Sequence, residues 1–338
     1  MNNLKQRYGP RICSLIPLDL WHRLFDIELV IPHWHVVSDR ELEHVSGLYK
    51  FRNLHQFKAD LEFFLRYYTP ISLQDVIRHL DGSGQLPKRC FLPTFDDGFR
   101  EIYDVVAPIL HAQGVPAVFF LITSVIDNRK LCYPQKKSLL IRALDSVGDS
   151  QAKQEVSRIL IENEIKGPDP TSCIRSIYYR QQHILDELGT VLECDFSSYV
   201  SSVQPYLTSE QIRDLMKMGF DIGAHSIDHP LYSELTLDEQ LDQTRDSLRG
   251  LSNRFQYNCR SFAFPYSDAG ISPEFFQKAF SDGYLKVSFG IGGIRRGYFP
   301  KNLPRFSMER TNLPAALILA RQFARAILQG PLMSKMSF

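Results

Sequence analysis

Two adjacent carboxylates in this 338-residue chain have the type and position to do chemistry. Asp96 and Asp97 stand in the run Thr94-Phe95-Asp96-Asp97-Gly98, directly after a short apolar stretch. In parallel α/β folds, reactive side chains gather where strands end. Adjacent carboxylates repel each other unless a positive group lies nearby, so one of them can bind a cation while its neighbour acts as a base. A turn with two solvated carboxylates is the alternative interpretation.

A pair of histidines follows a second apolar stretch. His225 and His229 stand in the run Gly223-Ala224-His225-Ser226-Ile227-Asp228-His229-Pro230. Histidines four residues apart can face the same side when the link between them is helical or tightly turned. Neutral imidazole nitrogens suit Zn²⁺, Co²⁺ or Ni²⁺. Taken alone, two such histidines are a weak pattern, because most histidines are ordinary surface or core residues.

Together the two motifs predict a catalytic metal site. Asp97, His225 and His229 supply three protein ligands and leave a position open for water, whereas a structural site is closed by four ligands. We expect a divalent metal, with zinc favoured over cobalt or nickel, and we expect Asp96 beside it as the general base. A third run, Phe262-Ala263-Phe264-Pro265-Tyr266, breaks a strand into a loop that could aim a backbone N–H at a reacting oxygen. An ordinary strand end is the alternative there.

The surrounding pattern predicts how these motifs are positioned. Short apolar runs alternate with segments of helical periodicity, which is typical of a parallel sheet with right-handed crossovers. The more polar stretch 127–205 interrupts this alternation and is predicted to be a mostly helical insertion in a single domain spanning 1–338. Residues 311–338 are predicted to form an amphipathic C-terminal helix and tail. The expected strands are 27–37, 90–95, 117–122, 220–224, 261–264 and 285–289, and the expected helices 54–68, 103–113, 212–218, 237–248 and 273–280.

Composition limits the classes of partner. The 39 Lys and Arg residues nearly balance the 38 Asp and Glu residues, which gives no electrostatic reason to expect a nucleic-acid partner. The six cysteines form no CxxC pair, which favours a reducing compartment. The first residues contain no apolar run of signal-peptide length, and no segment approaches the roughly 20 apolar residues of a membrane span. A cytoplasmic protein is therefore expected, with peripheral membrane contact through the C-terminal helix as a minor alternative.

The ordered set of TFDDG, then HSxxH, then a strand ending in Pro-Tyr resembles the polysaccharide deacetylase family, which includes chitin, peptidoglycan and chitooligosaccharide deacetylases. The resemblance implies a distorted (β/α) barrel of about seven strands. It implies a hydrolase that removes N-acetyl groups from a polysaccharide or glycan precursor, so the expected partner is an N-acetylated carbohydrate. At the matching positions it implies that Asp96 is the base, that Asp97, His225 and His229 bind the metal, and that the Tyr266 N–H joins the oxyanion hole.

Two departures from the family pattern concern the catalytic groups. The third family motif usually begins with an arginine that orients the base, and Ala263 stands there, with Ser267 in place of the usual glycine. The family also commonly uses a late histidine as general acid, yet no histidine follows His229. From their positions, His35 is our first candidate for the general acid, with protonated Asp96 as an alternative, and Arg305 is our candidate for orienting Asp96.

Two other functions fit the same motifs. A deacetylase homologue that binds carbohydrate without cleaving it would explain both departures, although the retained aspartates and histidines argue against it. A metal amidase acting on a small cyclic amide could use the same barrel. The insertion and the 12% aromatic content favour a larger sugar substrate.

Overall fold

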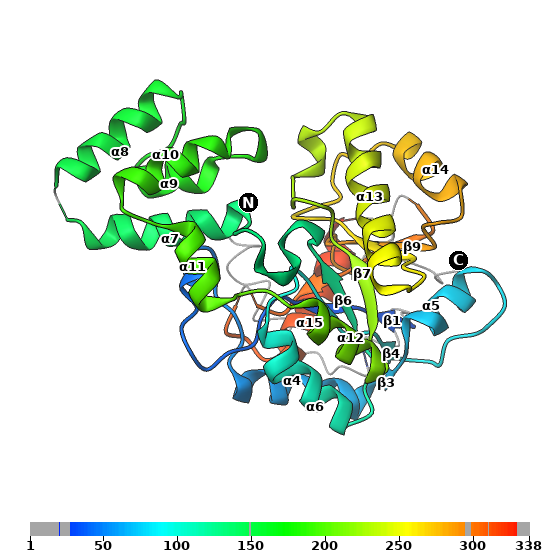
Figure 1. The fold of residues 1–338 in the computed structure, drawn as a ribbon. Helices are drawn as coiled ribbons and strands as arrows, with labels where there is room; N and C mark the ends of the chain where they lie inside the picture. Colours follow the sequence, from blue (N-terminus) through cyan, green and yellow to red (C-terminus); the bar gives the residue numbers. More distant parts are fainter. Residues whose placement is uncertain (1–19, 21–27, 149, 295–298, 310, 330–338) are drawn as a thin grey trace.

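The computed structural model of the chain describes residues 20, 28–148, 150–294, 299–309 and 311–329 (Figure 1). The N-terminal residues, on which the prediction about a leader segment rests, lie outside the described residues. The same holds for residues 330–338 of the predicted C-terminal tail.

An eight-stranded parallel sheet forms the centre of the fold. Its order is β10-β9-β8-β7-β6-β5-β2-β11, and every neighbouring pair is parallel. The first and last strands of this order, β10 and β11, are separated in the chain by Arg305 alone, so the sheet closes on itself at that residue as a distorted barrel. The strands are β2 (Pro32–Trp34), β5 (Thr94–Phe95), β6 (Val118–Leu121), β7 (Asp221–Ala224), β8 (Ser261–Ala263), β9 (Val287–Gly290), β10 (Asn302–Pro304) and β11 (Phe306–Ser307).

The first predicted strand is divided between two sheets. β1 (Leu29–Val30) pairs with β4 (Cys90–Phe91) in a separate sheet that also contains β3 (Thr69–Pro70), whereas β2 and β5 belong to the barrel. The ladder is interrupted at Leu92 and Pro93, between β4 and β5. Proline has no N–H to donate, so the ladder cannot run unbroken through that position. The sequence pattern of residues 27–37 predicts one strand because the segments in both sheets are buried and therefore apolar.

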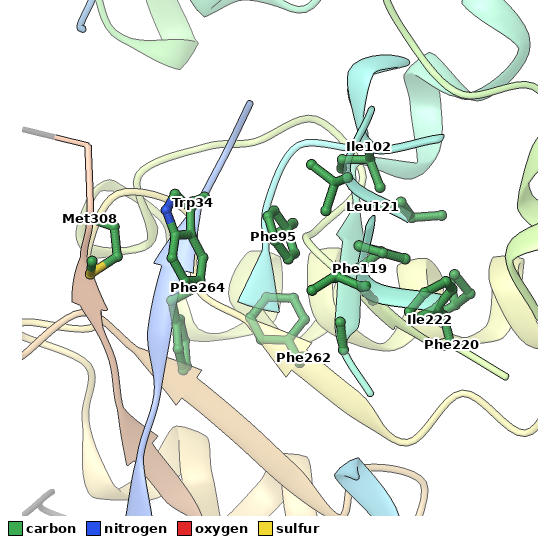
Figure 2. Close-up of a cluster of buried hydrophobic side chains, with 14 of the residues drawn as sticks. Trp34, Phe95, Ile102, Phe119, Leu121, Phe220, Ile222, Phe262, Phe264 and Met308 are labelled. Atoms are coloured by element: carbon green, nitrogen blue, oxygen red, sulfur yellow. The ribbon is translucent and has the colours of Figure 1, made fainter. Parts of the chain in front are cut away.

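Apolar side chains, many of them aromatic, fill the layer between the sheet and its helices (Figure 2). Trp34 stacks on Phe95 with ring centroids 5.3 Å apart, and Phe95 packs in turn on Phe119. The helices around the sheet begin at side-chain caps where the sequence places them: Thr208 and Thr236 each form a capping box, which satisfies two backbone groups at the helix start. The helix predicted to end at residue 248 continues to Phe255 because its apolar face continues through Leu251.

These surrounding elements are α3 (Glu43–Ser46), α4 (Leu54–Tyr67), α5 (Leu73–Leu80), the π-helix Ile102–Val106 with α6 (Ala107–Ala112), the 3₁₀ helices Thr123–Asn128 and Tyr232–Glu234, α12 (Ser209–Lys217), α13 (Leu237–Phe255), α14 (Pro273–Ser281) and α15 (Ala315–Gln329). Among the described helices, none combines the length and apolar character that a membrane crossing requires. The five described cysteines are free thiols.

Helices also fill the stretch between β6 and α12. They gather beside the barrel around a second apolar cluster, which also includes Val36, Val45 and Phe99 from the barrel side (Figure 1). α7 is fastened to α3, because the Ser138 hydroxyl donates to the Glu43 carbonyl at 2.6 Å and accepts from the Gly47 N–H at 2.9 Å. A Cβ at Gly47 would lie 2.8 Å from Ser138, so only glycine permits this approach. The helices are α7 (Tyr133–Ser146), α8 (Gln151–Glu162), α9 (Pro170–Ser176), α10 (His183–Val191) and α11 (Phe196–Val203), with the 3₁₀ turn Tyr179–Gln181.

Candidate active site

The two aspartates leave β5 through a strained turn. Asp97 adopts φ 72° and Gly98 φ 74°, in the left-handed region that non-glycine residues rarely visit. A Cβ at Gly98 would lie 2.9 Å from the end of the Leu121 side chain, which would have to shift to admit it. Such strain persists only where the surrounding structure holds it, and it gathers at functional sites. The turn sends the two neighbouring carboxylates to different partners.

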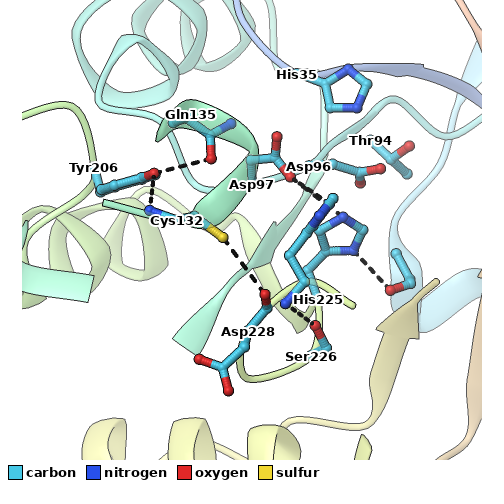
Figure 3. A network of polar contacts seen from close by, with 12 residues as sticks. His35, Thr94, Asp96, Asp97, Cys132, Gln135, Tyr206, His225, Ser226 and Asp228 are labelled. Atoms are coloured by element: carbon cyan, nitrogen blue, oxygen red, sulfur yellow. Dashed lines mark hydrogen bonds and ion pairs between the residues drawn. The ribbon is translucent and has the colours of Figure 1, made fainter. Parts of the chain in front are cut away.

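Asp97, His225 and His229 meet at one point. Asp97 Oδ1 lies 3.5 Å from His225 Nε2 and 3.3 Å from His229 Nε2. All three residues are buried, and their ligand atoms lie within 4.8 Å of one another. The histidines are linked by a tight turn, not a helix, with Ser226 at φ 65°, His229 at φ 63° and the Ser226 hydroxyl accepting from the His229 N–H at 2.9 Å. Figure 3 shows Asp97 and His225 close to Asp96.

The protonation of His225 suits a metal ligand. Its Nδ1 lies 2.8 Å from the Ala263 carbonyl and must donate to it, which leaves the lone pair of Nε2 directed at Asp97. Burial lowers the pKa of His225 to about 4, so the imidazole is neutral near pH 7. Burial alone would raise the pKa of Asp97, but His229, His35 and His225 hold it below its ordinary value. The ionised carboxylate of Asp97 and the neutral imidazole of His225 therefore face each other in the forms that bind a metal.

The residues present fit a divalent cation. Within the described part of the chain, the buried Asp97 Oδ1 accepts no hydrogen bond, although a buried carboxylate oxygen ordinarily has a partner. A metal ion between this oxygen and the two Nε2 atoms would satisfy it. The donor set of one oxygen and two imidazole nitrogens suits Zn²⁺, with Co²⁺ and Ni²⁺ also compatible.

Asp96 is paired with Arg305. The guanidinium donates from Nη1 to Oδ1 at 2.7 Å and from Nη2 to Oδ2 at 2.9 Å, and both side chains are almost completely buried. Arg305 also contacts Thr94 Oγ1 at 3.3 Å and lies over the Phe120 ring. Burial alone would raise the pKa of Asp96, but the charge of Arg305 keeps it well below its ordinary value. Arg305, which lies where the barrel closes, thus orients an ionised Asp96 through a bidentate ion pair.

His35 faces the same cavity from the end of β2, and its partner is Glu309. His35 Nδ1 lies 2.5 Å from Glu309 Oε2, and the backbone N–H groups of His35 and Val36 donate to Oε1 of the same carboxylate. Burial works to lower the pKa of His35, but the charge and hydrogen bond of Glu309 outweigh it and raise the pKa to about 9. His35 is therefore protonated near neutral pH. Sequence reasoning missed Glu309, although it follows the last barrel strand.

Tyr266 follows β8 in the left-handed region, at φ 56°. Its ring packs edge-on against His229 with centroids 4.6 Å apart, and its phenol interacts with that of Tyr133 on α7. Among the described residues, the Tyr266 N–H has no hydrogen-bond acceptor. The strained loop after β8 thus holds an N–H without an acceptor, in a residue whose ring contacts His229.

These groups share a cavity of about 630 Å³. The helices inserted after β6 line part of it with Gln135, Lys137 and Arg175, which the sequence did not single out. The structure brings all seven predicted site residues to this one end of the barrel, with Arg305 behind Asp96. The lining residues are His33, His35, Leu48, Tyr49, Lys50, Asp96, Asp97, Pro134, Gln135, Lys137, Arg175, His225, His229, Phe264, Tyr266, Ile291, Ser307 and Glu309.

Comparison with known proteins identifies the class. The sequence profile of the polysaccharide deacetylase family matches residues 83–285, more than half of the chain, so the chain belongs to that family. The match covers the Asp-Asp, His-His and Pro-Tyr motifs. The expected family and barrel fold are confirmed.

Particular relatives are distant. The chain is 36% identical over 61 residues to the poly-β-1,6-N-acetyl-D-glucosamine N-deacetylase of Escherichia coli strain K12, a match that covers 18% of this chain and 9% of that protein. The Streptococcus pyogenes deacetylase PplD, solved in complex with acetate, superposes with a TM-score of 0.56 at 16% identity over 87% of this chain and 97% of PplD. IcaB from Ammonifex degensii superposes with a TM-score of 0.53 at 16% identity, covering 88% of this chain and 97% of that one. At these identities the structural likeness establishes the fold.

Proposed function

We propose that this protein is a divalent-metal-dependent deacetylase that removes N-acetyl groups from a polysaccharide or glycan precursor. One observation carries the proposal: Asp97 Oδ1, His225 Nε2 and His229 Nε2 converge beside a second carboxylate, Asp96, that has a separate and oriented partner. This arrangement matches the needs of metal-assisted hydrolysis, with three protein ligands and an adjacent base.

Asp97, His225 and His229 would hold the metal. A divalent ion bound there supplies a water of lowered pKa and a Lewis acid for the acetamide oxygen. Asp96 accepts the proton of the attacking water. Its pairing with Arg305 keeps it ionised and fixes its plane, while a carboxylate retains further lone pairs for a third hydrogen bond.

His35 donates the proton that the departing amine needs. Its pairing with Glu309 keeps the imidazole charged near neutral pH and holds Nδ1, so that Nε2 is the nitrogen able to donate. This assigns the acid role to an early histidine and accounts for the lack of any histidine after His229. The Tyr266 N–H stabilises the oxyanion, a contribution of about 3 kcal/mol for one donor in other hydrolases.

Acetate release tests the proposal. Zinc-loaded protein should release acetate from β-1,6-linked or β-1,4-linked N-acetylglucosamine oligosaccharides, and Asp96→Asn should retain the metal but lose most of the turnover. Binding of these oligosaccharides by the wild-type protein without acetate release would instead favour the non-cleaving carbohydrate-binding homologue. Turnover of a small cyclic amide, and not of the oligosaccharides, would favour the amidase.

A further inference from the structure

Three cationic side chains line the proposed substrate cavity without an ionic partner. Lys50, Lys137 and Arg175 all lie in its wall. Across the ranges that the structure describes, no carboxylate lies within 4.0 Å of any of their charged atoms, whereas many other lysines and arginines form ion pairs at or under that distance. The carboxylates in the same wall face other groups: Asp96 pairs with Arg305, Asp97 faces the two histidines and Glu309 pairs with His35. None of them compensates the three cations at ion-pair distance.

Lys137 carries most of this argument because it is buried. Its residue is 6% exposed, and its ammonium donates to the Arg175 carbonyl at 3.1 Å and lies 5.0 Å from the Tyr133 ring centroid. Burial lowers the pKa of Lys137 to about 8. The negative charge of Glu234, which lies beyond ion-pair distance, offsets only part of this lowering. A buried cation with only neutral partners is costly, and an anion supplied by a ligand would compensate it.

Lys136, the neighbour of Lys137 on α7, has a carboxylate partner, so the unpaired cation occurs on the side of α7 that faces the cavity. Lys136 pairs with Asp186 at 2.5 Å and lies outside the cavity. Arg175 comes from α9 and donates to the Leu48 carbonyl at 3.2 Å, which holds its guanidinium beside the loop that carries Lys50. Two helices of the insertion and one loop of the barrel thus contribute the three cations to one cavity.

We infer that the substrate carries an anionic group, a carboxylate or a phosphate, near the N-acetylated sugar, and that Lys50, Lys137 and Arg175 bind it. This inference rests on the proposed deacetylase function. It assigns the insertion a role in substrate selection, since charge-assisted hydrogen bonds from lysine and arginine favour carboxylates and phosphates over neutral hydroxyls.

Binding and turnover with three matched substrates test the inference. The first is a neutral N-acetylglucosamine oligosaccharide, the second alternates N-acetylglucosamine with glucuronic acid, and the third is the neutral oligosaccharide with a terminal phosphate. Calorimetry with zinc-loaded Asp96→Asn should show that one acidic ligand binds at least about tenfold more tightly than the neutral one, equivalent to ~1.4 kcal/mol. The acidic ligand that shows the preference identifies carboxylate or phosphate as the group.

Lysine-to-glutamine substitutions then show which side chains cause the preference for acidic ligands. In the Asp96→Asn background, Lys137→Gln should reduce the ratio of acidic to neutral affinity by about fivefold or more. Lys50→Gln, at an exposed position, should reduce it by a smaller factor. Lys136→Gln removes the same charge from the adjacent position of α7 and should leave the ratio unchanged. Equal affinity for all three ligands, or a ratio that Lys137→Gln and Lys50→Gln do not alter, would overturn the inference. Failure of the wild-type protein to release acetate from any substrate would overturn the proposed function instead, because the binding ratio does not depend on turnover.

Discussion

Replacing Arg305 by methionine should remove both stability and catalysis. The side chain is 0% exposed and makes two hydrogen bonds to Asp96, at 2.7 and 2.9 Å. Methionine approximates its apolar stem but leaves the buried Asp96 carboxylate without a cationic partner. Breaking one side of a buried ion pair costs about 3–5 kcal/mol, because the remaining charge stays desolvated. Urea unfolding followed by tryptophan fluorescence and circular dichroism measures this loss.

A double-mutant cycle separates the charge effect from simple loss of packing. Arg305→Met and Asp96→Leu should each destabilise the fold, whereas the double variant should lose much less than the sum, since neither charge is then left alone. Arg52→Met is the matched control: it breaks another buried pair, Arg52 Nε to Asp60 Oδ2 at 2.8 Å, away from the cavity. The control should lose similar stability and still release acetate when folded. Additive losses in the cycle, or full turnover by folded Arg305→Met, would refute the reasoning.

The remaining predictions concern the metal ligands and the proton donor. His229→Gln removes one of the three proposed ligands, so elemental analysis should find well under one equivalent of metal, while His35→Gln should retain a full equivalent. The reverse result would show that the metal binds elsewhere. Because Glu309 raises the pKa of His35 to about 9, turnover should fall as pH rises through about 9, where His35 loses its proton. Glu309→Gln should move that alkaline limb to lower pH in a kcat–pH profile, and an unmoved limb would remove His35 as the acid.

Much of the site could be predicted because its residues follow strand ends. Asp96 and Asp97 come after β5, and His225 and His229 come after β7, so a parallel sheet brings both motifs to the same end of the barrel. The capped starts of α12 and α13 could be predicted from Thr208 and Thr236, because a capping box is a local pattern.

Contacts between distant segments could not be predicted in the same way. Glu309 lies 274 residues from His35, and only the closure of the barrel brings β11 beside β2. A carboxylate just after the last barrel strand was a usable signal. Lys137 gave no such signal, since a lysine on an amphipathic helix ordinarily faces solvent. Its ammonium instead contacts the Arg175 carbonyl of α9, a segment that the local sequence pattern does not place beside it. The first predicted strand is divided into β1 and β2, which pair with β4 and β5 on either side of Pro93. The local sequence of the first strand does not show that its partner is interrupted there.

The proposed catalytic metal site is tested most directly by titrating chelator-stripped protein with zinc while acetate release from an N-acetylglucosamine oligosaccharide is measured. Stripped wild-type protein should be inactive and should recover full activity at one equivalent of zinc. Asp97→Ala should recover none. Full activity in the stripped wild-type protein, or recovery by Asp97→Ala at the same zinc concentration, would contradict metal-dependent deacetylation at Asp97, His225 and His229.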